Sequence, residues 1–121
     1  MSGRPDIRSL LAGDERILEM VGSADRVMEG NVVEKLPYSP PLVLLEIARG
    51  APMLEGGTGV IAEKWECSIG ILAEGCAYEL ADRIDAAMEG IGFGHEATVR
   101  HAAGRPEWSC LISRYSGARM R

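Results

Sequence analysis

Apolar and polar residues alternate strictly over 64–71, and this pattern limits the fold more than any other feature of the chain. Four apolar residues share one face of an extended segment, and four polar or small residues share the other: Trp65, Cys67, Ile69 and Ile71 against Lys64, Glu66, Ser68 and Gly70. Successive side chains of a strand point to opposite faces, so the alternation predicts a half-buried strand. Its apolar face needs a second layer of structure to cover it.

A helix over 77–89 is the best candidate for that layer. Its apolar residues recur at helical spacing and form one stripe: Ala77, Leu80, Ala81, Ile84 and Met88. Glu79 and Arg83 stand four residues apart in the order that favours an ion pair on a helix surface. Gly90 follows the stripe and predicts the end of the helix in a left-handed conformation.

Two short helices are predicted near the N-terminus. The first starts at Pro5-Asp6 and stops at Gly13, because proline and an acidic residue both suit a first helical turn. In the second, Asp14 caps the free backbone amides and Gly22 ends the helix.

Strands are predicted at 26–30, 42–48, 97–101 and 108–115, besides the alternating one. Residues 42–48 (LVLLEIA) start apolar on both faces, which indicates a central strand or one covered on both sides. Residues 31–41 hold three prolines and predict an extended surface connection. Residues 49–60 are rich in glycine and predict a flexible loop, long enough for a protruding hairpin.

This order of elements predicts an α+β fold. We expect a mostly antiparallel sheet with one long helix packed on a face and two short N-terminal helices. A length of 121 residues fits a single domain over 1–121.

The charge balance argues against a protein that grips nucleic acid. The chain carries 13 basic and 18 acidic residues, a net charge of −5, whereas phosphate-neutralising domains carry an excess of Lys and Arg. An acidic surface would instead let DNA slide past. The three cysteines, an odd number with no CxxC, favour folding in a reducing compartment. No signal peptide or membrane span is predicted, so we expect a soluble protein made in the cytoplasm.

Candidate cofactor and metal motifs are weak. Gly57-x-Gly59-x-x-Ala62 matches the dinucleotide fingerprint in form, but a strand and not a helix is predicted after it, so a plain loop is favoured. The two histidines, His95 and His101, show no zinc-ligand spacing with the cysteines. We expect no metal and no cofactor.

Candidate catalytic residues are equally few. Cys67 and Cys110 lie in strand patterns and are expected to be buried, while Cys76 lies at the start of the long helix, where the helix dipole favours a thiolate. A structural role is favoured for all three. Asp82 and Asp85 are expected on a solvated helix face. The sequence therefore predicts no catalytic site.

A subunit contact is the more promising hypothesis. Apolar residues in a glycine-rich loop often mark such contacts, although Met53 and Leu54 could equally fold back onto their own core. The basic C-terminal tail, with Arg119, is expected to be frayed or docked on a neighbour. The predicted interface residues are Met53, Leu54, Gly56, Gly57, Thr58, Gly59 and Arg119.

Nearly the whole chain resembles the tail-completion, or tail-terminator, proteins of long-tailed phages, prophages and gene transfer agents. The matching segments are residues 7–11, 14–22, 25–27, 41–45, 65–69, 77–88 and 108–115. They are patterns of small and apolar residues, and the link over 31–41 departs from the commoner form of the family.

The resemblance implies a structural virion protein and not an enzyme. It implies a ring of subunits, usually six, at the head-proximal end of the tail, where it caps the tube and meets the head–tail connector protein. Partners would be further copies of the chain, the tail tube protein and that connector, while DNA passes through without specific binding. Alternatives are a neck or head-closure subunit, a small cellular ligand-binding α+β domain, and an unrecognised thiol enzyme.

Overall fold

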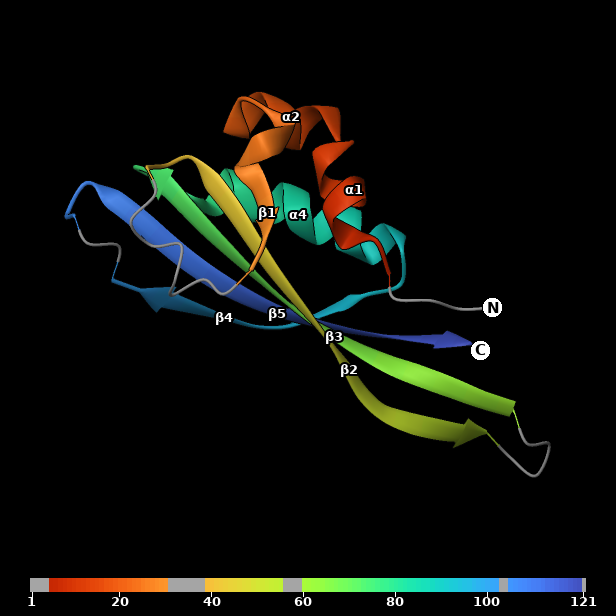
Figure 1. Cartoon of the computed structure of the whole chain (residues 1–121). Coiled ribbons are helices and arrows are strands. Elements are labelled where there is room, and N and C mark those ends of the chain that lie inside the picture. The colour runs from red at the N-terminus through yellow and green to blue at the C-terminus, as the bar shows by residue number, and fades with distance from the viewer. Residues whose placement is uncertain (1–4, 31–38, 56–59, 103–104, 121) are drawn as a thin grey trace.

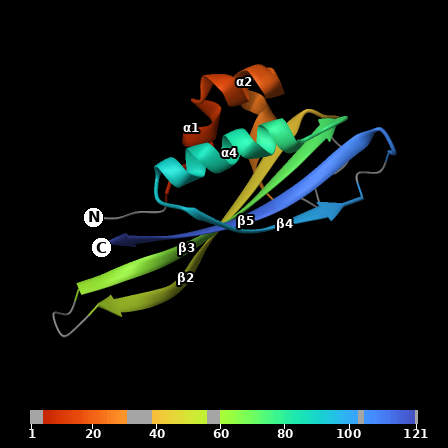
Figure 2. The same ribbon diagram turned by 180° about the vertical axis from the view of Figure 1, so that it is seen from behind.

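The computed structural model describes residues 5–30, 39–55, 60–102 and 105–120, and only the backbone of 49–55, 60–62 and 119–120. The elements in chain order are α1 (Ile7–Ala12), α2 (Glu15–Val21), the 3-10 turn η1 (Ala24–Arg26), β1 (Val27–Glu29), β2 (Leu42–Glu55), β3 (Val60–Glu74), α4 (Tyr78–Gly90), β4 (Gly94–His101) and β5 (Trp108–Met120). In the described part of the chain they form one five-stranded sheet with its helices on one face (Figures 1 and 2).

The sheet has the order β1-β2-β3-β5-β4. Its neighbouring strands are antiparallel except for the short β1, which lies parallel to β2. This arrangement confirms the predicted α+β class, with its mostly antiparallel sheet, its covering helix and its two short N-terminal helices. The one parallel pair, β1 with β2, was not predicted.

Both N-terminal helices begin as the sequence predicts. Asp6 caps α1 by accepting from the Ser9 amide, and Asp14 caps α2 by accepting from the Ile17 amide, each at 3.1 Å. Each carboxylate oxygen thereby satisfies an amide that has no partner within the helix.

The end of α4 differs slightly from the prediction. Gly90 is still helical, and the left-handed residue is Gly92, with φ +84°. The Phe93 amide donates to the Met88 carbonyl, so the left-handed residue comes two residues later than expected.

The main core lies between the helices and the sheet. The predicted alternation is confirmed, because Trp65, Cys67, Ile69 and Ile71 are all buried in this core with the apolar stripe of α4. A second, smaller cluster lies on the opposite face of the sheet, with Leu42, Leu44, Leu72 and Cys110 buried. The start of β2 is therefore buried on both faces, as its sequence predicts.

Candidate subunit-contact surface

The sheet continues well beyond its helices as a narrow three-stranded arm. We define the arm as residues 49–55 of β2, 60–65 of β3 and 117–120 of β5, which project away from the helical layer (Figures 1 and 2). Its pairing is antiparallel throughout, with Arg49 opposite Trp65 and Gly117 opposite Trp65 on the other side. The protruding hairpin expected from the sequence is therefore present.

The prediction of a flexible loop over 49–60 is wrong for most of its length. Residues 49–55 belong to β2, and β3 already begins at Val60. A β-bulge between Arg49 and Pro52 absorbs Gly50 and Ala51, and pairing resumes with Pro52 opposite Glu63. A bulge accommodates residues that break regular pairing, which is why glycine and proline did not end this strand.

The predicted interface residues divide into two groups. Met53 pairs with Ala62 and Leu54 with Ile61 at the outer end of the hairpin, and Arg119 pairs with Glu63. Gly56, Gly57, Thr58 and Gly59 lie outside the described residues, as do the two glycines of the dinucleotide-like motif. The prediction that the C-terminal tail is frayed is wrong, because β5 continues beyond Tyr115 to Met120.

Close packing at the base of the arm joins it to the body. Phe93, buried just after α4, lies over Gly117 of β5, and a Cβ on Gly117 would stand 2.8 Å from the Phe93 ring. Trp65 is buried beside this contact. Only glycine allows so close an approach of backbone to ring, so the position where the arm leaves the body is set by this pair.

One carboxylate is buried within the arm. Glu63 is 5% exposed, and its register position in β3 faces Pro52 on one side and Arg119 on the other. Opposite-charge residue types across neighbouring strands favour one register over its alternatives.

The cysteines lie where the sequence placed them. Cys67 and Cys110 are buried in the two apolar clusters, and Cys76 is exposed just before α4. Burial in apolar surroundings raises the pKa of the Cys110 thiol, which disfavours its reactive thiolate.

Both histidines lie on β4, the outer strand of the sheet. His95 is near its start and His101 is its last residue, and both are exposed. Among the described residues, no group of three or more His, Cys, Asp and Glu side chains is arranged to hold a metal ion.

A chain of polar contacts joins α4, β5 and β4, and sequence reasoning missed it. Tyr115 is 1% exposed, and its hydroxyl donates to Asp85. Asp85 therefore faces the sheet, and the prediction that it lies on a solvated helix face is wrong. On β4, Thr98 contacts Ser113 at 2.9 Å and His95 at 2.6 Å, and the His95 ring lies 5.4 Å from that of Tyr115. Desolvation by burial, aided by Asp85, raises the pKa of Tyr115.

The sequence did contain a signal that Asp85 lies next to the buried face of α4. Asp85 follows Ala81 by four residues and precedes Met88 by three, so it borders the apolar stripe of the helix. A carboxylate at such a position needs a buried donor, and the tyrosine at the centre of β5 supplies one.

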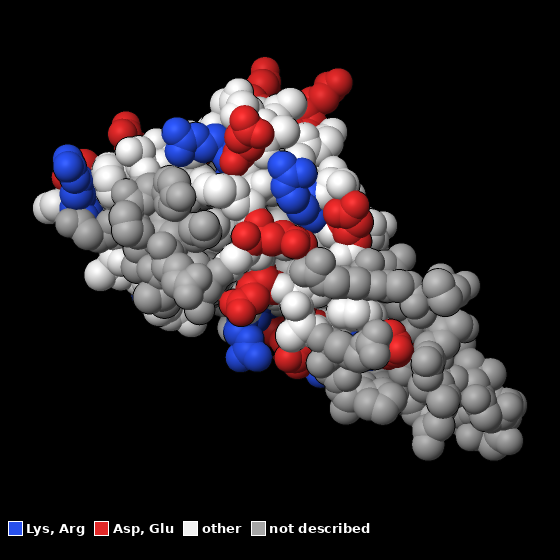
Figure 3. All heavy atoms as spheres, in the orientation of Figure 1, with Lys and Arg blue, Asp and Glu red and all other residues white. Residues whose placement is uncertain are grey.

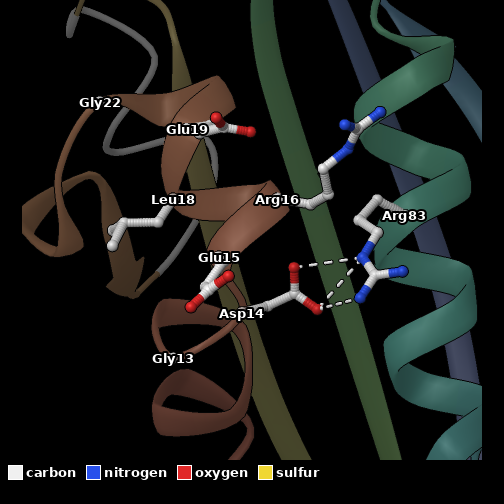
Figure 4. A pocket seen from close by; sticks show the side chains of 8 residues that line it. All are labelled: Gly13, Asp14, Glu15, Arg16, Leu18, Glu19, Gly22 and Arg83. Carbon is white, nitrogen blue, oxygen red and sulfur yellow. Dashed lines mark hydrogen bonds and ion pairs between the residues drawn. The ribbon is translucent and has the colours of Figure 1, made fainter.

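A depression on the described surface lies between α2 and α4 (Figure 4). It is lined by Gly13, Asp14, Glu15, Arg16, Leu18, Glu19, Gly22 and Arg83. Arg83 does not pair with Glu79 as predicted but with Asp14, 2.8 Å away, while Glu79 faces Arg16 at 3.7 Å. Asp14 and Arg83, two of the charged residues that line this depression, are therefore paired with each other.

Charges of both signs are interspersed over the helical side of the molecule (Figure 3). This mixture is typical of a solvated surface and gives no large field of one sign there. Within the described residues, no helix is long and apolar enough to cross a membrane.

Comparison with known protein families gives no match, and comparison with curated proteins gives none either.

Proposed function

We propose that this chain is a structural subunit of a phage-type tail, which assembles into a ring of the tail-terminator kind. One observation carries the proposal: the sheet extends past its own helices as an arm whose two outer strands each have an edge left unpaired by the described residues. Such edges are costly to leave bare, and proteins normally cover them or use them in contacts.

The chemistry of the arm suits a contact between subunits. Met53 and Leu54 are apolar residues near Glu55, the last residue of β2. Burial of such side chains stabilises an interface by about 1.5–3 kcal/mol each when it is complete. A ring requires a contact between two different surfaces of the same chain, and an arm reaching toward a neighbour provides one of them.

The polar groups best placed for chemistry already have structural partners. Arg83 is bound to Asp14, and Tyr115 is bound to Asp85. These pairs support a structural role for the four side chains. The net charge of −5 is compatible with a channel that DNA crosses without adhering.

Electron microscopy with tail tubes tests the proposal. The purified chain is mixed with tubes assembled from the tube protein of the same particle, and the tube ends are imaged. We expect a ring at one end and an end to further tube growth. A ring that binds the head connector but leaves the tube end bare would assign the chain to the neck. A chain that stays monomeric beside growing tubes would refute the proposal.

A further inference from the structure

Among the described residues, the register of the sheet leaves two strand edges open, one on β2 and one on β5. β1 pairs with β2 only up to Leu45, so in the described part of the chain the outer edge of β2 is unpaired from Glu46 onward. β4 pairs with β5 only as far as Ser116, so no described residue pairs with the outer edge of β5 over 117–120. Each edge is a row of backbone donors and acceptors that can accept another strand.

The two edges have matching directions. β2 and β5 are each antiparallel to β3, so they run the same way on opposite sides of the arm. The β2 edge of one copy can therefore pair in parallel with the β5 edge of the next, and the same contact can repeat from copy to copy. A repeated contact between two different edges closes into a ring when the rotation between copies allows it.

We propose that the open edge of β2 at 46–49, where the strand enters the arm, binds the β5 edge at 117–120 of a second copy, so that the sheet continues across the subunit boundary. The inference rests on the proposed ring and adds the contact that would form it. The bulge and Pro52 restrict pairing on β2 to residues 46–49, ahead of the bulge. That length matches the four free residues of β5.

The alternation of side chains limits the register of this contact. Ala48 and Ala118 are both exposed, and both lie on the face opposite Ile47, which packs against the main core. A continued sheet keeps its buried face on one side, so Ala118 must lie opposite an even-numbered residue of β2, either Ala48 or Glu46.

Both registers shift the neighbouring copy along the strand. Within one copy, Ala48 of β2 and Ser116 of β5 both lie opposite Glu66 of β3. Pairing Ala48 with Ala118 of the next copy therefore needs a shift of two residues along the strand, about 7 Å. Pairing Glu46 with Ala118 needs about 13 Å. A shift of constant sense at every boundary is what closing a sheet into a barrel requires.

Paired cysteines test the contact in the whole chain. In a Cys76→Ser background, Ala118→Cys is combined with Ala48→Cys, with Glu46→Cys, or with Ile47→Cys as the control on the wrong face. Strands in one sheet lie about 4.8 Å apart, within the Cα separation that a disulfide spans. We expect one even-numbered pair to give a ladder of oligomers on a non-reducing gel that collapses to monomer on reduction, and the Ile47 control to give no ladder.

The other outcomes separate this inference from the proposed function. Rings seen by microscopy without cross-linking of either even-numbered pair would overturn the edge contact and leave the ring intact. Dimers formed by Ala48→Cys alone would show a two-fold pairing of β2 edges and overturn the repeated contact. Absence of any association would refute both the edge contact and the ring.

Discussion

Asp14 and Arg83 tie the second N-terminal helix to the long helix. Arg83 donates from Nε and Nη2 to the carboxylate of Asp14, at 3.1 and 2.8 Å. The same carboxylate accepts from the Ile17 amide at 3.1 Å and so caps α2. One side chain therefore starts a helix and fixes its position on the core.

Replacement of Asp14 separates these two contributions. Asp14→Ala loses the cap and the ion pair, and loss of the cap alone costs about 1 kcal/mol of unfolding free energy. Asp14→Asn keeps a capping oxygen and loses only the charge, so we expect it to be the milder change. Urea unfolding of both variants checks this order, and equal losses would show that the cap contributes nothing.

The same pair makes stability depend on pH. The hydrogen bond from Arg83 holds the pKa of Asp14 below its ordinary value of 3.8. The unfolded chain therefore takes up this proton at higher pH than the folded one, and the stabilisation is present above pH 3.8 and lost as pH falls through the folded pKa. Thermal melts should show wild type and Asp14→Asn converging as pH falls below 3.8, and a constant gap would contradict the pairing.

Tyr115→Phe tests the polar chain between α4 and β4. The change removes the hydroxyl that Asp85 accepts from, and loss of a buried hydrogen bond to a charged group costs about 1–3 kcal/mol. Because the pKa of Tyr115 is raised by folding, the wild-type protein should also lose stability as pH rises above the ordinary value of 10.0. Melts of the Phe variant should lack that part of the alkaline loss, and an identical alkaline profile would argue against a buried Tyr115.

Gly117→Ala tests the base of the arm. A methyl group there would stand 2.8 Å from Phe93, so Phe93 must move, at a cost of about 1–3 kcal/mol. Gly94→Ala is the matched control, because no atom lies within 4 Å of its added Cβ. Phe93→Leu should partly rescue the Gly117→Ala variant, and a Gly117→Ala protein as stable as the control would mean that the ring does not sit over this glycine.

The cysteines should separate stability from assembly. Cys67→Ala and Cys110→Ala remove buried groups and should each cost about 1–3 kcal/mol, whereas exposed Cys76→Ser should leave the melting temperature unchanged. None of the three should alter association of the folded protein, as sedimentation would show. If Cys76→Ser left the fold intact but abolished assembly, the exposed thiol would have a function that the present account omits.

The sequence predicted the local elements well because their signals are local. Asp6 and Asp14 cap their helices through side-chain oxygens close in the chain, and the alternation around Ile69 follows from the pleat of one strand. Contacts between elements that are distant in the chain have no comparable local signal in the sequence. Glu79 was the nearest partner for Arg83 along the helix, but Asp14, 69 residues away, has the better geometry in space.

The extent of the arm was underestimated for a related reason. Gly50 and Pro52 have low strand propensity, so residues 49–55 look like a loop when they are taken alone. Pairing with β3 overrides that preference, and the bulge removes the conflict with regular hydrogen bonding. Whether Met53 and Leu54 contact a neighbour is a matter of association, and this stays a prediction.

Native mass measurement of wild type beside a variant with Met53→Asp and Leu54→Asp tests the central claim most directly. The arm projects away from the helical layer (Figure 1), so we expect the two charges to leave the melting temperature unchanged. In an interface the same charges would be buried without partners, which opposes association. We expect wild type to form a closed ring as its concentration rises and the folded variant to stay monomeric. A variant that forms the same ring would contradict the account, and so would a wild-type protein that stays monomeric at every concentration and beside tail tubes.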